Sequence, residues 1–161
     1  MRGEASIRRA MAGDIDEITA IEHRCFPGPT AYPKVQLAYL VLKANSICLV
    51  EDSPEGIHGF IVVLYRRGTR VGCLETLDVD PKFQKMGVGQ RLLAAAEAEI
   101  KKRGCCFFQL EVSEGNKVAL TLYQKAGYKQ KARLPNYYRY EHCGTRDAVR
   151  MFKPLNLSSK P

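Results

Sequence analysis

Hydrophobic residues recur at helical spacing in four stretches of the chain, separated by prolines and glycines. These stretches predict helices over residues 12–26, 33–44, 88–103 and 116–127. Asp14 and Asn116 stand where N-caps are expected, and Gly104 and Gly127 follow the last apolar residues of their helices. Each predicted helix has one apolar face, which has to pack against another part of the molecule.

Shorter runs of β-branched and aromatic residues predict strands. They cover residues 6–10, three strands within 46–80, and then 105–113, 128–134 and 147–155. The turn sequences SPEG and RRGTR separate the three strands of the 46–80 stretch. Because strands and helices are interleaved without a repeat, a linker or a shift in composition, we expect one α/β domain over residues 1–161, with a core over about 5–154 and a tail over 155–161.

Composition narrows the class of protein. A chain of 161 residues with 45% hydrophobic content can bury a sizeable core. It has no apolar run of membrane-spanning length and no apolar segment typical of a secretory signal, so a soluble, cytoplasmic protein is expected. The six cysteines and three histidines lack metal-ligand spacing, and we expect no metal. The net charge of +8 favours an anionic partner: a nucleic acid, a membrane surface or a phosphorylated small molecule.

A glycine-containing turn, Gln84-Lys85-Met86-Gly87-Val88-Gly89, precedes the helix predicted over 88–103. The unpaired backbone N–H groups and the positive dipole end of that helix favour a bound anion, which small residues allow to approach closely. Leu92 takes the third glycine position of the dinucleotide fingerprint, and no Lys-Ser/Thr follows as in a nucleotide P-loop. The alternative is that the glycines only permit a tight turn.

The motifs taken together resemble the GNAT superfamily of acetyl-CoA-dependent N-acyltransferases. The pattern Gln84-x-x-Gly87-x-Gly89 after LDVDP is similar to the family's pyrophosphate loop. LEVSEGNKVALTLYQKAGY, followed by NYY and DAVRM, is similar in order and spacing to the branch that acetylates N-terminal alanine of ribosomal proteins. The correspondence is close from Cys73 to Met151. The implied fold is a mixed, mostly antiparallel sheet of six to seven strands, with helices on both faces and a splayed central pair of strands.

The resemblance also implies where acetyl-CoA binds. The pyrophosphate lies at the helix start, and the amide-bearing arm pairs with the strand that precedes the loop and splays from its neighbour at a bulge. The residues assigned to the cofactor are Leu77, Asp78, Val79, Gln84, Lys85, Met86, Gly87, Val88, Gly89, Gln90, Asn116 and Tyr123. From the residues alone, Asn116 is equally well explained as a plain N-cap.

Two side chains are candidates for acid–base chemistry. Glu111 shares a strand face with Phe107 and Gln109 and lies at the carboxyl end of its strand. The alternative is a solvated carboxylate without a role, whereas its family position implies the general base that deprotonates an attacking amine. Tyr123 lies two helical turns after Asn116 and is the implied acid for the departing thiolate, with core packing as the alternative.

Glu75 is a rival base or a substrate contact, and strand alternation predicts that it shares a face with Leu77 and Val79. Tyr137 and Tyr138 resemble the family's substrate-side tyrosines, although they could also serve packing or an interface. No role is assigned to the histidines.

The acceptor stays open, because PGPTAYPKV replaces the branch's usual PWS and the chain has no tryptophan. A protein N-terminus is the first choice, ahead of a lysine side chain or a small-molecule amine. Two non-enzymatic functions are alternatives. One is a nucleic-acid-binding module, suggested by the basic run over 117–139, and the other is an acyl-CoA sensor without catalysis. Monomer and homodimer are both open.

Overall fold

The computed structural model describes residues 3–155. In chain order its main elements are β1 (Ser6–Arg9), α1 (Ile15–Cys25), α2 (Lys34–Leu42), β2 (Ser46–Ser53), β3 (Gly56–Tyr65), β4 (Val71–Val79), α3 (Val88–Lys102), β5 (Phe107–Ser113), α4 (Lys117–Lys125), β6 (Lys129–Leu134) and β7 (Ala148–Pro154). These elements match the predicted helices and strands to within a few residues. No helix in the described part is long and apolar enough to cross a membrane.

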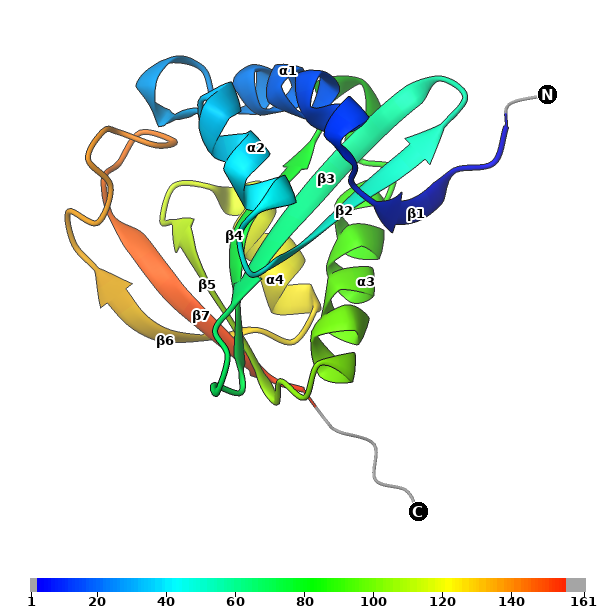
Figure 1. Cartoon of the computed structure of the whole chain (residues 1–161). Coiled ribbons are helices and arrows are strands. Elements are labelled where there is room, and N and C mark those ends of the chain that lie inside the picture. The colour runs from blue at the N-terminus through cyan, green and yellow to red at the C-terminus, as the bar shows by residue number, and fades with distance from the viewer. Residues whose placement is uncertain (1–2, 156–161) are drawn as a thin grey trace.

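The strands form one mixed sheet in the order β1-β2-β3-β4-β5-β7-β6. Neighbours are antiparallel except β4 and β5, which run parallel and pair only from Val71 to Cys73 with Phe107 to Gln109. Beyond Cys73 the two strands diverge, as Figure 1 shows in the centre of the molecule. The mixed sheet with a splayed central pair is thus confirmed.

Helices cover both faces of the sheet because alternate residues of β3 point to opposite sides. Phe60 and Val62 pack in one apolar cluster with residues of α1 and α2, including Ile18 and Leu37. Ile61 and Val63 pack in the other cluster, which contains the buried stripe of α3: Val88, Leu92, Leu93, Ala96 and Ile100. The apolar faces predicted from the sequence are therefore the faces that build the core.

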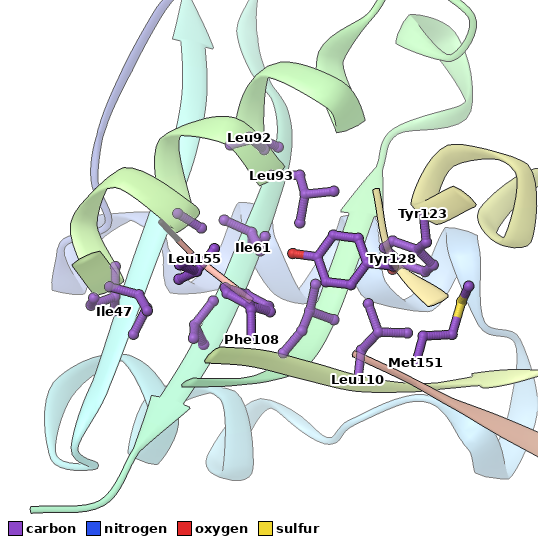
Figure 2. Close-up of a cluster of buried hydrophobic side chains, with 14 of the residues drawn as sticks. Ile47, Ile61, Leu92, Leu93, Phe108, Leu110, Tyr123, Tyr128, Met151 and Leu155 are labelled. Carbon is purple, nitrogen blue, oxygen red and sulfur yellow. The ribbon is translucent and has the colours of Figure 1, made fainter. Parts of the chain in front are cut away.

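The second cluster extends under the diverging strands. Figure 2 shows Phe108 and Leu110 of β5 beside Met151 of β7, with Tyr123 and Tyr128 above them. Leu155 also belongs to this cluster, and its N–H donates to the carbonyl of Cys106. The core therefore includes Leu155, the first residue of the predicted tail; the other residues of that tail, 156–161, lie outside the described part.

Asp14 precedes α1 as predicted, but its side chain makes no cap hydrogen bond to that helix. Its carboxylate instead accepts from the N–H of Met11 at 2.8 Å and from the guanidinium of Arg8 at 2.8 and 3.0 Å. Because Arg8 lies in β1, Asp14 joins the first strand to the start of α1. Asn116 does cap α4, since its Oδ1 accepts from the N–H of Ala119 at 3.1 Å.

Candidate active site

A β-bulge in β4 opens the edge of the sheet. Val62 pairs with Thr76 and Val63 pairs with Leu74, so Glu75 is an extra residue without a partner in β3. The extra residue shifts the alternation: Leu77 packs in the α3–α4 core cluster, whereas Glu75 contacts Tyr32, which packs with the α1–α2 cluster. The prediction that Glu75 shares a face with Leu77 and Val79 is wrong for this reason.

The backbone of β4 offers unpaired groups where β5 departs. The N–H of Asp80 donates to the carbonyl of His58 in β3. Because hydrogen-bonded pairs alternate along an antiparallel ladder, Asp78 also faces β3, while Leu77 and Val79 face the gap toward β5. Asp78 is therefore not available to bind a cofactor through its backbone. The Val79 carbonyl is already paired, because it accepts from the Gln84 side-chain amide and from the Cys25 thiol, each at 3.2 Å.

The loop before α3 has the geometry of an anion site. Gly87 is the N-cap of the 15-residue helix α3 with φ of 81°, and Lys85 also has a positive φ of 64°. Gln84, Lys85, Met86 and Gly87 are exposed, whereas the Val88 side chain is buried, so only its backbone can meet a ligand. A Cβ built on Gly87 would lie 2.8 Å from Nη1 of Arg91. The bare backbone at the helix start therefore fits a pyrophosphate.

A cavity of about 320 Å³ lies between the diverging strands and the loops above them. Its lining residues come from α1, β4, β5, α4 and the two long loops: Glu22, Phe26, Thr30, Tyr32, Leu74, Glu75, Thr76, Leu77, Glu111, Val112, Ser113, Asn116, Ala119, Tyr123, Tyr138, Arg139, Tyr140 and His142. It brings together the candidate bases Glu75 and Glu111 with the candidate acid Tyr123. Tyr137 is not in its lining; the ring is 48% exposed and packs edge-on against Tyr138.

Glu111 is held from one side by the neighbouring strand. Arg150 lies opposite it in β7 and donates to its Oε1 through Nε at 3.2 Å and Nη2 at 3.1 Å. No hydrogen bond to Oε2 is found in the described part of the chain. The ion pair thus orients the carboxylate and leaves one oxygen to accept a proton.

Glu75 is oriented by a residue that sequence reasoning did not identify. The phenol of Tyr32, in the loop between α1 and α2, donates to Oε1 of Glu75. Burial, followed by the adjacent Glu75 carboxylate, raises the pKa of Tyr32, so this phenol stays a donor. The sequence around Tyr32 contains only turn signals, and no spacing links it to β4.

Tyr123 occupies a position that suits an acid. Its ring is 5% exposed and packs edge-on against Tyr128, with centroids 5.8 Å apart. Burial, followed by Asp78 and Tyr138, raises the pKa of the Tyr123 phenol above its ordinary value. The phenol therefore stays protonated at neutral pH and can donate. Tyr123 therefore packs in the core and also lines the cavity.

Aromatic side chains line one end of the cavity. His142 stacks on Phe26 with centroids 4.9 Å apart and lies 5.2 Å from the ring of Tyr138. Burial lowers the pKa of His142, so the imidazole is neutral at neutral pH. No role was predicted for His142, and its sequence neighbourhood contains no signal that could have placed it here.

A family model described as Acetyltransferase (GNAT) family matches residues 15–128, which is most of the chain. The chain therefore belongs to the GNAT family of acetyltransferases. The splayed strands, the bulge and the glycine loop described above lie within the matched region.

Two curated proteins are similar to this chain in sequence over part of their length. The ribosomal protein bS18-alanine N-acetyltransferase of Escherichia coli strain K12 is 34% identical over 84 residues, which are 52% of this chain and 56% of that protein. The matched stretch thus spans little more than half of this relative. N-alpha-acetyltransferase 30 of Xenopus laevis is 29% identical over 103 residues, 62% of this chain and 38% of that protein.

The fold extends over the whole described chain in a solved structure. The crystal structure of the ribosomal-protein-S18-alanine N-acetyltransferase from Escherichia coli superposes with a TM-score of 0.85, covering 98% of this chain and 97% of that chain at 23% identity. The similarity in fold therefore includes β6 and β7, which lie beyond the residues matched by the family model.

Proposed function

We propose that the chain is an acetyl-CoA-dependent N-acetyltransferase that acetylates the N-terminal amine of a protein or peptide. The observation that carries the proposal is a cavity that is lined by a buried phenol, Tyr123, and an oriented carboxylate, Glu111, where β4 and β5 diverge. The glycine-containing start of α3 follows β4 in the chain and lies outside this lining. Acetyl-CoA supplies the activated acyl group. Family membership and the names of the relatives support this choice.

In this proposal, one set of residues binds the cofactor and two side chains transfer protons. The helix start at Gly87 to Gly89 holds the pyrophosphate, and the backbone of Leu77 and Val79 together with the side-chain amide of Asn116 hold the extended arm. Glu111 accepts the proton of the acceptor ammonium, directly or through water. Tyr123 donates a proton to the departing thiolate.

The charges around the cavity favour an amine as acceptor. Glu22, Glu75 and Glu111 line it, against one lining cation, Arg139. A cationic ammonium is therefore attracted to this end of the site. A terminal amine, with an ordinary pKa of about 8, loses its proton more readily than a lysine side chain with about 10.4. The N-terminus is accordingly the preferred acceptor.

A panel of acceptors tests the proposal through release of the coenzyme A thiol. We expect fastest release with a synthetic peptide that begins with alanine, and slow release with the same peptide blocked at its N-terminus and carrying an internal lysine, or with a polyamine. Faster turnover of the lysine peptide or the polyamine would move the acceptor to that class. No thiol release with any amine would leave an acyl-CoA-binding module.

Matched variants assign the base within the same assay. Glu111→Gln keeps the size of the side chain and should lower turnover roughly 10²-fold or more, because it removes the proton acceptor. Glu75→Gln should have a smaller effect, since Gln can still accept from the phenol of Tyr32. Acetyl-CoA affinity should change little in both. The reverse ranking would assign the base to Glu75.

A further inference from the structure

Two buried carboxyl groups beneath the cavity each have an oxygen without a partner. Glu22, in the last turn of α1, and Asp78, near the end of β4, are both 1% exposed. Oε1 of Glu22 and Oδ2 of Asp78 have no hydrogen-bond partner in the described part of the chain. A buried carboxylate oxygen without a donor is costly, so this arrangement requires an explanation.

The other oxygen of each group is already bonded. Oε2 of Glu22 accepts from the N–H of Tyr32 at 3.1 Å, and Oδ1 of Asp78 accepts from the hydroxyl of Thr76 at 2.6 Å. The two carboxyl groups lie within hydrogen-bonding reach of each other. One proton placed between the two unpartnered oxygens satisfies both and removes the repulsion of two buried negative charges.

Among residues 3–155, no unpaired cation faces the two carboxyl groups to replace this proton. Four titratable side chains face the pair. They are Cys25 of α1, Tyr32 of the loop after α1, Tyr123 of α4 and His142 of the loop before β7. All four are neutral at neutral pH, because burial raises the pKa of the thiol and the phenols and lowers that of the imidazole. The nearby Arg24 is paired with Asp80 at 2.5 Å. Burial, followed by Glu22, raises the pKa of Asp78 well above its ordinary value.

The pair connects directly to the acceptor side of the site. Glu22 itself lines the cavity and holds the backbone of Tyr32. The phenol of Tyr32 in turn holds the Glu75 carboxylate. A change in the pair is therefore transmitted to Glu75 through one loop residue.

We infer that Glu22 and Asp78 are positioning residues of the acceptor site: one proton shared by their unpartnered oxygens holds the pair together, and through Tyr32 the pair fixes Glu75. The inference rests on the proposed function for its acceptor, but the shared proton can be measured without any turnover.

Infrared spectroscopy of the whole chain tests the shared proton. At neutral pH the wild-type protein should show the carbonyl stretch of a protonated carboxyl group. Glu22→Gln and Asp78→Asn should each abolish this band, because the amide donates in place of the proton and the remaining carboxylate ionises. Asp16→Asn, an exposed site in the same helix as Glu22, should keep it. A wild-type spectrum without the band at neutral pH would overturn the inference.

Kinetics with the alanine-initiated peptide test the positioning role. Glu22→Ala should raise the KM for the peptide about tenfold or more while the KM for acetyl-CoA changes less than about threefold, and Glu22→Gln should restore most of that loss. In the wild type the peptide KM should rise at alkaline pH, as the shared proton is lost and the two charges repel. This rise should be absent in Glu22→Gln.

Two outcomes contradict the positioning role. One is a Glu22→Gln variant as impaired as Glu22→Ala, and the other is an alkaline rise in KM that persists in Glu22→Gln. If the wild-type protein does not acetylate the peptide at all, the proposed function fails, and the infrared measurement still decides whether the proton is shared.

Discussion

Tyr123 shows how one side chain can serve both packing and chemistry. Tyr123 belongs to the core cluster that packs on β5, and it also lines the cavity. Its neighbour Tyr128 is equally buried, but the phenol of Tyr128 donates to Oε2 of Glu97 at 2.8 Å, away from the site. Two adjacent tyrosines in the same core therefore provide a catalytic candidate and its matched control.

Tyr123→Phe removes the phenol and keeps the ring. We expect turnover to fall roughly 10- to 10⁴-fold, because the departing thiolate loses its proton donor, with little change in acetyl-CoA affinity or melting temperature. Tyr128→Phe should do the opposite: turnover stays, and the free energy of unfolding falls by about 1.5–3 kcal/mol through the lost bond to Glu97. Wild-type turnover in Tyr123→Phe would leave Tyr123 as a packing residue.

At the scale of elements, the start of α3 is held by an arginine from its own first turn. Arg91 donates to the carbonyl of Met86 at 2.9 Å and to both carboxylate oxygens of Glu51 in β2 at 2.7 and 3.1 Å. The loop that we propose to bind the pyrophosphate is thereby tied to the sheet. Gly87 lies beside these contacts of Arg91, since a Cβ there would meet the Arg91 guanidinium.

Gly87→Ala should weaken acetyl-CoA binding about tenfold, or about 1.4 kcal/mol, measured by calorimetry. The new methyl group strains a left-handed residue and displaces Arg91 from the loop. Gly68→Ala is the control, because Gly68 has nearly the same φ, 82° against 81°, but no atom within 4 Å of the added Cβ. Both variants should lose similar stability, and only Gly87→Ala should lose affinity. Equal affinities in the two variants would remove the loop from the cofactor site.

Over the whole molecule, the sheet consists of two halves that pair directly at only three positions of β4 and β5. The larger apolar cluster joins these halves from below, and the cavity occupies the opening between them. On the β2–β3 side, the buried Glu51 carboxylate binds both Arg91 and His58, the latter through Nδ1 at 3.0 Å. This network links two strands and α3, so its charge state bears on the stability of the fold.

Ionised Glu51 should stabilise the fold, so part of the stability lost at acid pH (the acid limb of the stability curve) should come from its protonation. Arg91, followed by His58, lowers the pKa of Glu51 below its ordinary 4.5. A lowered pKa means that the stabilisation is present above about pH 4.5 and is lost as the pH falls through the folded-state value. Glu51→Gln should therefore reduce the free energy of unfolding at neutral pH by about 1.5–3 kcal/mol and flatten the acid limb.

Thermal unfolding measured between neutral and acid pH checks this expectation. Glu55→Gln, at an exposed turn position between β2 and β3, is the control and should follow the wild-type curve. An unchanged acid limb in Glu51→Gln would assign the acid sensitivity to other carboxylates, such as Asp14 beside Arg8.

The sequence by itself determined the helices and strands and the glycine-containing turn that we propose for the cofactor. The buried stripe of α3, the glycine-containing turn before it, the cap at Asn116 and the strand ending near Glu111 are local patterns, in which residues a few positions apart share a face or flank a helix. Local patterns can be read before the chain is folded. The resemblance to a known family then connected them to a function.

Only the tertiary structure decided which distant side chains meet. The bulge at Glu75 depends on how β3 pairs with β4, and it reverses the face that alternation predicts. The contacts of Tyr32 with Glu75, and of Glu22 with Asp78, join residues more than 40 positions apart. Proton sharing depends on burial and on the absence of a neighbouring cation in the described part of the chain. Both are properties of three-dimensional packing, because desolvation and pairing depend on distance in space and not on spacing in the sequence.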